Sequence, residues 1–258
     1  MRHTPPNNTG DAARPTGCGR PSRLALAAWG GATLALFLSF VFDQAAYHAL
    51  LMGKEAVEPW WWYRIVRQIG SLTVWVPVAA VAGAVTPGSW RRRVRAGAAV
   101  LAAAALGGLL AEVLKPVIGR DRPLHHDGGS VFRPLDDRLS GGLGFPSSHA
   151  GVAFGGAWLL WRMARSRLPE RAGFERLARS GWVWVGGLAI VLAIACGISR
   201  TLTGAHFLSD VIAGAMLGVL AANGLGWWIT PGRARRCPGV WLLRPRRRVG
   251  PGPRSDQP

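Results

Sequence analysis

The feature that most constrains this chain is the grouping of its apolar residues into long blocks. A helix needs about 20 apolar residues to cross the hydrocarbon core of a bilayer. Most of the blocks come close to that length, and the weakest is the fourth. The sequence therefore predicts an all-α polytopic membrane protein, a bundle of six transmembrane helices. The blocks cover residues 24–43, 69–86, 96–114, 148–163, 181–199 and 207–229.

The basic residues are concentrated on one side of these blocks. The chain carries 31 Lys and Arg against 13 Asp and Glu, a net charge of +18. If the N-terminus is cytoplasmic and all six blocks span, 22 of the 31 basic residues fall in or beside segments 1–23, 87–95, 164–180 and 230–258. This is the positive-inside asymmetry. It predicts a multi-pass cell-membrane protein with both termini in the cytoplasm.

Nucleic acid is not expected as a partner despite the net charge. The arginines flank the apolar blocks along the whole chain and do not form one patch. We expect three regions: a disordered cytoplasmic tail at 1–23, a six-span domain at 24–230 with its core at 96–229, and a disordered basic tail at 231–258. No obligatory protein partner is evident.

Three polar stretches fall on the non-cytoplasmic side in this topology. They are "KPVIGRDRP" (115–123), "GFPSSHA" (144–150) and "SRTLTGAHFLSD" (199–210). Each lies at the end of a predicted helix and faces the same water, so we expect them to form one pocket. The charged residues near the 124–145 loop, Asp121 among them, are expected to be solvated.

The pocket would contain three cations, Lys115, Arg122 and Arg200. Arginine offers a planar fork suited to phosphate oxygens, and lysine a compact point charge. Two forks and one point charge suit a dianionic phosphoryl group, although any one of them alone could be an interfacial charge that reaches into water. Glu112 is expected to pair with Lys115 at a spacing of three.

The second stretch has the pattern of a helix start. Ser147 is the expected N-cap, so Ser148 and His149 would lie in the first turn. The free N–H groups and the positive dipole end of a helix N-terminus favour an anion.

His206 and Asp210 are four residues apart, which predicts one face of the helix that begins the sixth span. A carboxylate there can fix the imidazole tautomer and leave the other ring nitrogen as a nucleophile. Alternatively, Asp210 only satisfies a histidine at a helix end. A metal bound by His149, His206 and Asp210 is disfavoured, because the three cations would repel it.

Taken together, these residues resemble three known signature motifs. Lys115 and Arg122-Pro123 match a lysine followed, after six residues, by Arg-Pro; Pro146 to His149 match Pro-Ser-Gly-His; and Ser199-Arg200, His206 and Asp210 match the third motif. The set is similar to that of the type 2 phosphatidic acid phosphatase superfamily, which also contains vanadium haloperoxidases. Ser148 departs from it, since glycine is usual there.

The resemblance implies a phosphatase without metal or other cofactor. It implies that His206 attacks phosphorus to form a phosphohistidine, that Asp210 orients the ring, and that His149 donates a proton to the leaving oxygen and later activates water. The expected phosphate-binding residues are Lys115, Arg122, Ser147, Ser148 and Arg200.

The residues leave the substrate open. Phosphatidate and an isoprenoid diphosphate such as undecaprenyl diphosphate both fit, because the motifs contact phosphate and not the lipid tail. A non-catalytic transporter or scaffold is the alternative function, and a vanadate-dependent haloperoxidase a weaker one, since those members are soluble. The expected partners are a lipid phosphate and the bilayer.

Overall fold

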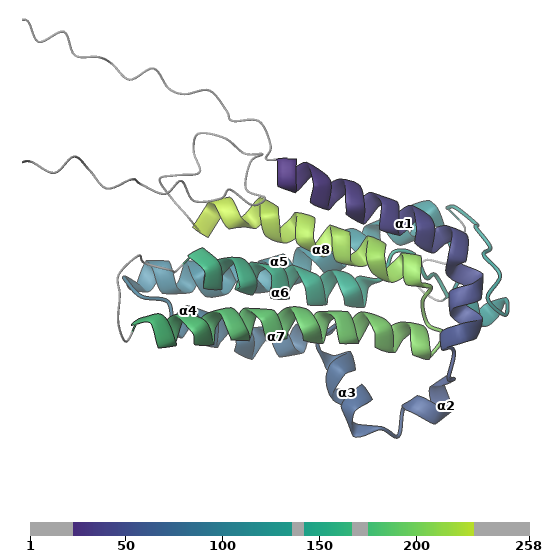
Figure 1. Cartoon of the computed structure of the whole chain (residues 1–258), viewed down its shortest axis with the longest axis horizontal. Coiled ribbons are helices and arrows are strands. Elements are labelled where there is room, and N and C mark those ends of the chain that lie inside the picture. Colours follow the sequence, from purple (N-terminus) through teal and green to yellow (C-terminus); the bar gives the residue numbers. More distant parts are fainter. Residues whose placement is uncertain (1–22, 136–141, 167–174, 230–258) are drawn as a thin grey trace, which may run out of the picture.

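The structure is a computed structural model that describes residues 23–135, 142–166 and 175–229 (Figure 1). Nearly all of both predicted tails, and Asp136 and Asp137 of the loop, lie outside these residues. The described elements are helices, joined by loops that contain two isolated β-bridges. In chain order they are α1(Arg23–Leu50), α2(Lys54–Val57), α3(Trp61–Gln68), α4(Leu72–Ala84), α5(Trp90–Ile118), the 3₁₀ helix η1(Pro123–His125), α6(Ser148–Ser166), α7(Glu175–Leu202) and α8(Leu208–Ile229).

The long helices form a bundle with α6 at its centre (Figure 1). α6 packs against α5, α7 and α8, while α4 lies on α5 and α1 lies on α8. Glycines allow the central helices to approach closely. A Cβ placed at Gly151 would lie 2.4 Å from the carbonyl oxygen of Gly107. The close approach of α5 and α6 therefore leaves no room for a side chain at either glycine.

Each of the six predicted blocks corresponds to a described helix, but they do not all have the character of a span. Four helices, α1, α5, α7 and α8, are long and apolar enough to cross a membrane, and α3 with α4 forms a fifth candidate if the bent pair counts as one. α6, the weakest block in the sequence, is not among them. Its central position explains this, because a helix surrounded by other helices needs small residues more than apolar ones.

The second block differs most from its prediction. The structure breaks the chain between α3 and α4, which are bent by 66°. Ser71 caps α4, and its side chain accepts a hydrogen bond from the backbone N–H of Thr73 at 3.4 Å. α3 extends to the side of the bundle (Figure 1). The sequence did not predict α3, because its residues include Arg64, Arg67 and Gln68 beside the tryptophans.

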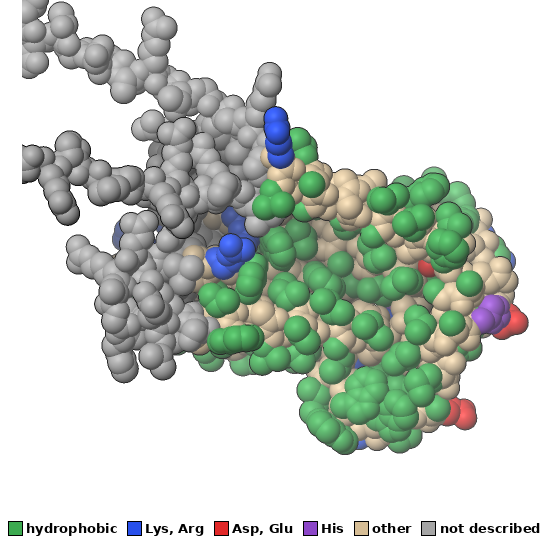
Figure 2. All heavy atoms as spheres, viewed as in Figure 1, with side chains coloured by type: hydrophobic (Ala, Val, Ile, Leu, Met, Phe, Trp, Pro, Cys, Tyr) green, Lys and Arg blue, Asp and Glu red, His purple; other side chains and the backbone are tan. Residues whose placement is uncertain are grey.

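The sides of the bundle are covered by hydrophobic side chains (Figure 2). Phe37, Leu109 and Val191 are each more than half exposed. Such an apolar exterior is unfavourable in water and is expected where lipid surrounds a protein. Together with the spanning helices, it supports the predicted multi-pass membrane protein.

Candidate active site

The three polar stretches meet at one end of the bundle. They are the C-terminal end of α5, the N-terminal end of α6 and the link between α7 and α8. The Lys115 Nζ atom donates to Ser148 Oγ at 3.3 Å, which joins the first stretch to the second. The backbone N–H of Ser147 donates to the Asp210 carbonyl at 2.9 Å, which joins the second to the third. The predicted convergence is therefore confirmed.

α6 begins at Ser148, as predicted. Ser147 is fully buried, and its hydroxyl accepts a long hydrogen bond of 3.5 Å from the N–H of Ala150, which is the N-cap pattern. The first N–H groups of a helix have no partner within it. The amides of Ser148 and His149 therefore point from the end of α6 toward the meeting point of the three stretches, where an anion is favoured.

The relation between His206 and Asp210 differs from the prediction. α8 begins at Leu208, so His206 precedes the helix and the two residues do not share a helical face. Asp210 instead folds back on the start of α8, where its Oδ2 atom accepts from the Phe207 N–H at 2.9 Å. This is one half of a capping box, the contact from an acidic residue at the third helical position to the N-cap backbone.

The carboxylate still faces the imidazole. Asp210 Oδ2 lies 3.5 Å from His206 Nδ1, slightly longer than an ordinary hydrogen bond. Within the described chain, Nδ1 of this ring has no hydrogen-bond partner, and the side chain is 3% exposed. Burial lowers the pKa of His206, and Arg200 acts in the same direction, whereas Asp210 opposes both. The ring is therefore neutral at pH 7, the form that can attack an electrophile.

Four cations act electrostatically in the site. Lys115 and Arg200 act on both histidines, Arg67 acts on His149, and Arg122 acts on Arg200. Arg200 is 8% exposed, and among the described residues its Nε atom has no hydrogen-bond partner. A buried guanidinium N–H without an acceptor is unfavourable unless an anion binds there.

Acceptors within the protein orient the side chains of Lys115 and Arg122. Lys115 Nζ lies 2.7 Å from Glu112 Oε1, so the predicted pair is confirmed. Arg122 Nε donates to the Leu143 carbonyl at 3.4 Å. Glu112 is more than half exposed and Lys115 is 12% exposed, so water weakens the attraction between the two charges. Glu112 therefore orients the Lys115 side chain and leaves its positive charge available to an anion.

Sequence reasoning missed a buried ionic group behind Asp210. Arg120, fully buried, donates to Asp210 Oδ1 at 3.0 Å and to Asp43 Oδ2 at 2.8 Å. Asp43, on α1, also accepts from the N–H of Ser209 at 3.0 Å and from its hydroxyl. The signal available in the sequence was Asp43 itself, since an acidic residue in an apolar helix is usually functional.

Asp121 is also not solvated as expected. It is 4% exposed, and its Oδ2 atom lies 2.8 Å from His126 Nε2. The reason is the close return of the loop onto the end of α5. Gly119 has a φ of 64°, and a Cβ there would lie 2.0 Å from the Arg133 carbonyl oxygen, so only glycine allows this return.

A family model described as PAP2 superfamily matches residues 96–233, just over half of the chain. The chain belongs to the PAP2 superfamily. The match contains all eight residues that the sequence predicted for the site, while Asp43 and α3 lie before it. The family therefore accounts for the centre of the site and not for its surroundings.

The curated relatives are membrane-lipid enzymes and a transport protein by name. Lipid A 4'-phosphatase of Bacteroides thetaiotaomicron is 29% identical over 118 residues, 45% of this chain and 43% of that protein. Bacitracin transport permease protein BcrC of Bacillus licheniformis is 36% identical over 83 residues, 32% of each chain. The matched segments thus span less than half of either relative.

A solved structure has the same fold. The transmembrane PAP2-type phosphatidylglycerolphosphate phosphatase of Bacillus subtilis matches with a TM-score of 0.51 and 24% identity, over 78% of this chain and 98% of that one. At this identity the likeness supports the helical arrangement and not a shared substrate.

Proposed function

We propose that this PAP2-superfamily protein is an integral membrane lipid phosphatase that uses His206 as its nucleophile. The observation that carries the proposal is the position of the buried His206 beside Asp210, where Lys115 and Arg200 act on it electrostatically. An anion bound there would have its charge balanced, with a nucleophile within the same pocket.

In the first step, the Nε2 atom of His206 attacks phosphorus and the bond from phosphorus to the leaving oxygen breaks, which leaves a phosphohistidine. The leaving oxygen belongs to the lipid in a monophosphate and to the inner phosphate in a diphosphate. Asp210 balances the positive charge that develops on the ring. His149, protonated once the dianionic phosphate lies beside it, gives its proton to this leaving oxygen. In the second step, His149 takes a proton from water as the water attacks phosphorus, and inorganic phosphate and free His206 result.

The cations and the α6 N-terminus stabilise the charge that spreads over the phosphoryl oxygens. Lys115, Arg122 and Arg200 supply fixed positive charge, and Ser147, Ser148 and the first amides of α6 supply hydrogen bonds. This donor set fits an anion and would repel a divalent cation. Within residues 23–135, 142–166 and 175–229, no three His, Cys, Asp or Glu gather as a metal site. Metal-independent hydrolysis is therefore part of the proposal.

The proposed topology has six spans, with α6 and the bent α3–α4 pair each crossing once. The asymmetry of basic residues supports cytoplasmic termini and an active site on the extracytoplasmic face. The site end is opposite the N-terminal end of α1 (Figure 1). The substrate would be a lipid phosphate or diphosphate presented from the outer leaflet, such as phosphatidate or undecaprenyl diphosphate.

Transport is the second candidate, because one relative is named as a transport permease. A transporter would bind a phosphorylated lipid or antibiotic without cleaving it. It would have no need for an unpaired, neutral histidine next to a carboxylate. Release of inorganic phosphate separates the two functions.

The test is phosphate release by the purified protein in detergent with excess EDTA. Phosphatidate and undecaprenyl diphosphate are the substrates. We expect EDTA-resistant release that disappears in His206→Ala and persists in the control His48→Ala, which changes an exposed histidine at the end of α1. Trapping of labelled phosphate on wild-type protein after acid-free quenching would report the phosphohistidine. Release by His206→Ala at the wild-type rate would overturn the mechanism.

A further inference from the structure

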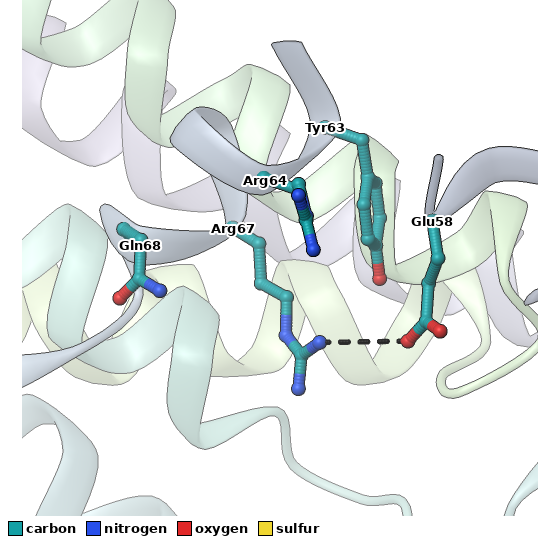
Figure 3. A pocket seen from close by; sticks show the side chains of 5 residues that line it. All are labelled: Glu58, Tyr63, Arg64, Arg67 and Gln68. Carbon is teal, nitrogen blue, oxygen red and sulfur yellow. Dashed lines mark ion pairs between the residues drawn. The ribbon is translucent and has the colours of Figure 1, made fainter. Parts of the chain in front are cut away.

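A polar pocket lies on α3, outside the matched family region. Its volume is about 230 Å³. Figure 3 shows the side chains that line it, with the guanidinium of Arg67 and the carboxylate of Glu58 turned toward each other. The lining residues are Glu58, Tyr63, Arg64, Arg67 and Gln68.

The pattern of α3 explains why this pocket is polar. Tyr63 and Val66 face the protein, and Trp61 and Ile65 are more than half exposed on another side. Arg64, Arg67 and Gln68, spaced by three and four residues, fall on the remaining face. Two arginines thus line a pocket that contains one carboxylate, so the pocket has an excess of positive charge.

The ion pair in the pocket is loose. Arg67 Nη1 lies 3.7 Å from Glu58 Oε1, and both side chains are at least 40% exposed. Glu58 also lies 3.6 Å from Lys54 Nζ. Exposed pairs of this kind contribute little to stability, so a phosphate oxygen can displace Glu58 from Arg67 at small cost.

The pocket adjoins the proposed catalytic centre. Arg67 interacts electrostatically with His149 and Arg200, and Tyr63 interacts with Arg200. The link between α3 and α4 also packs on His149, since a Cβ at Gly70 would lie 2.7 Å from the His149 Cβ atom. An anion in the pocket would therefore lie near His149 and Arg200, two residues proposed to act on the phosphoryl group.

We infer that this pocket binds a second phosphate group of the substrate, one that His206 does not attack. Arg67 is the main contact, and Arg64 is an additional one, because a guanidinium fork matches two phosphate oxygens. The preferred substrate class is then a lipid diphosphate, with the terminal phosphate at His206 and the inner phosphate at α3. This inference rests on the proposed function and narrows its substrate.

The test compares two lipids with the same isoprenoid tail, a monophosphate and a diphosphate, by initial rates in neutral detergent. For Arg67→Met, we expect the ratio of kcat/KM for the diphosphate to that for the monophosphate to fall about tenfold, mainly through the KM for the diphosphate. Glu58→Gln should change the ratio in the opposite direction, because it removes the group that competes for Arg67. A variant that merely misfolds would not raise the ratio.

Lys54→Met is the matched control. It removes a cation that pairs with the same Glu58 but does not line the pocket. We expect it to leave the ratio within about twofold, the scatter expected for an exposed charge. Equal losses on both lipids in Arg67→Met, or an unchanged ratio, would overturn the inference. So would a loss that appears only when anionic phospholipid is added to the detergent, since the pocket would then bind bulk headgroups.

Failure of the proposed function would give different assay results from failure of the second phosphate site. In that case the wild-type protein releases phosphate from neither lipid, or His206→Ala releases it as fast as wild type. Wild-type release that depends on His206, without a change of ratio in Arg67→Met, would contradict the second phosphate site alone.

Discussion

The guanidinium of Arg120 holds the carboxylate of Asp210 from the side opposite to His206. Arg120 Nη1 donates to Asp210 Oδ1 at 3.0 Å, while Oδ2 of the same carboxylate lies 3.5 Å from His206 Nδ1. Arg120 and Asp210 are both fully buried, and the guanidinium also lies 3.9 Å from the Phe207 ring centroid. Arg120 is therefore a positioning residue, since it acts on His206 only through Asp210.

Arg120→Met removes the one guanidinium shared by Asp43 and Asp210. Loss of one partner from a buried pair costs about 3–5 kcal/mol, because the remaining charge is left without compensation. We expect kcat to fall about 100-fold, as for other groups that hold a catalytic residue in place. Thermal unfolding in detergent should shift to lower temperature as well. Activity and stability like wild type would contradict this role.

The double variant Arg120→Met with Asp43→Asn separates stability from positioning. It removes one of the two buried carboxylates along with the cation, so part of the stability should return. The rate should stay low, because Asp210 still lacks its support. Recovery of both stability and rate would show that Arg120 has only a structural role.

Asp43→Asn tests whether α1 contributes to the site. The amide has nearly the same shape as the carboxylate but loses the charge that faces Arg120 and the N–H of Ser209. Charge-assisted hydrogen bonds contribute about 1.5–3 kcal/mol, so we expect a loss of stability in that range. The kcat should fall by less than in Arg120→Met. Gln44→Ala, at the exposed neighbouring position, is the control for both measurements.

The sequence predicted the motif residues that meet at the helix ends, and it missed the buried partners that lie behind them. Lys115, Ser147 and Arg200 could be found because the ends of spanning helices face the same water. The pairs that Arg120 forms with Asp43 and Asp210 join positions 77 and 90 residues apart. Hydropathy and spacing contain no information on which side chains pair when their segments are far apart in the chain. The bend before α4 was missed for another reason: Arg64, Arg67 and Gln68 interrupt the apolar pattern of α3, so α3 itself was not predicted.

Ser148→Gly restores the residue that is usual in the second motif. The change removes the hydroxyl that accepts from Lys115 Nζ at 3.3 Å and keeps the backbone N–H at the start of α6. Since Glu112 still orients Lys115 at 2.7 Å, we expect kcat/KM to stay within about threefold of wild type. Lys115→Met, which removes the cation itself, should lower kcat/KM about 100-fold. Steady-state kinetics on one substrate compares the two variants.

The pKa of His206 can be measured directly by NMR. Its pKa is lowered from the ordinary value of 6.5 mainly by burial, with Arg200 adding to the effect and Asp210 opposing it. The difference between the ¹³C NMR titrations of wild type and His206→Asn should place this pKa below 6.5. Asp210→Asn should lower it further, since the opposing charge is removed.

The same shift has a consequence for stability. Below pH 6.5 the unfolded chain binds a proton at His206 that the folded protein does not, so the free energy of unfolding falls as the pH falls from about 6.5 toward the folded pKa. His206→Asn should make stability less dependent on pH in this window. A folded pKa above 6.5 would contradict the prediction. It would mean that the carboxylate held by Arg120 dominates over burial. A folded pKa above about 7 would leave His206 mostly protonated at neutral pH and unable to act as the nucleophile.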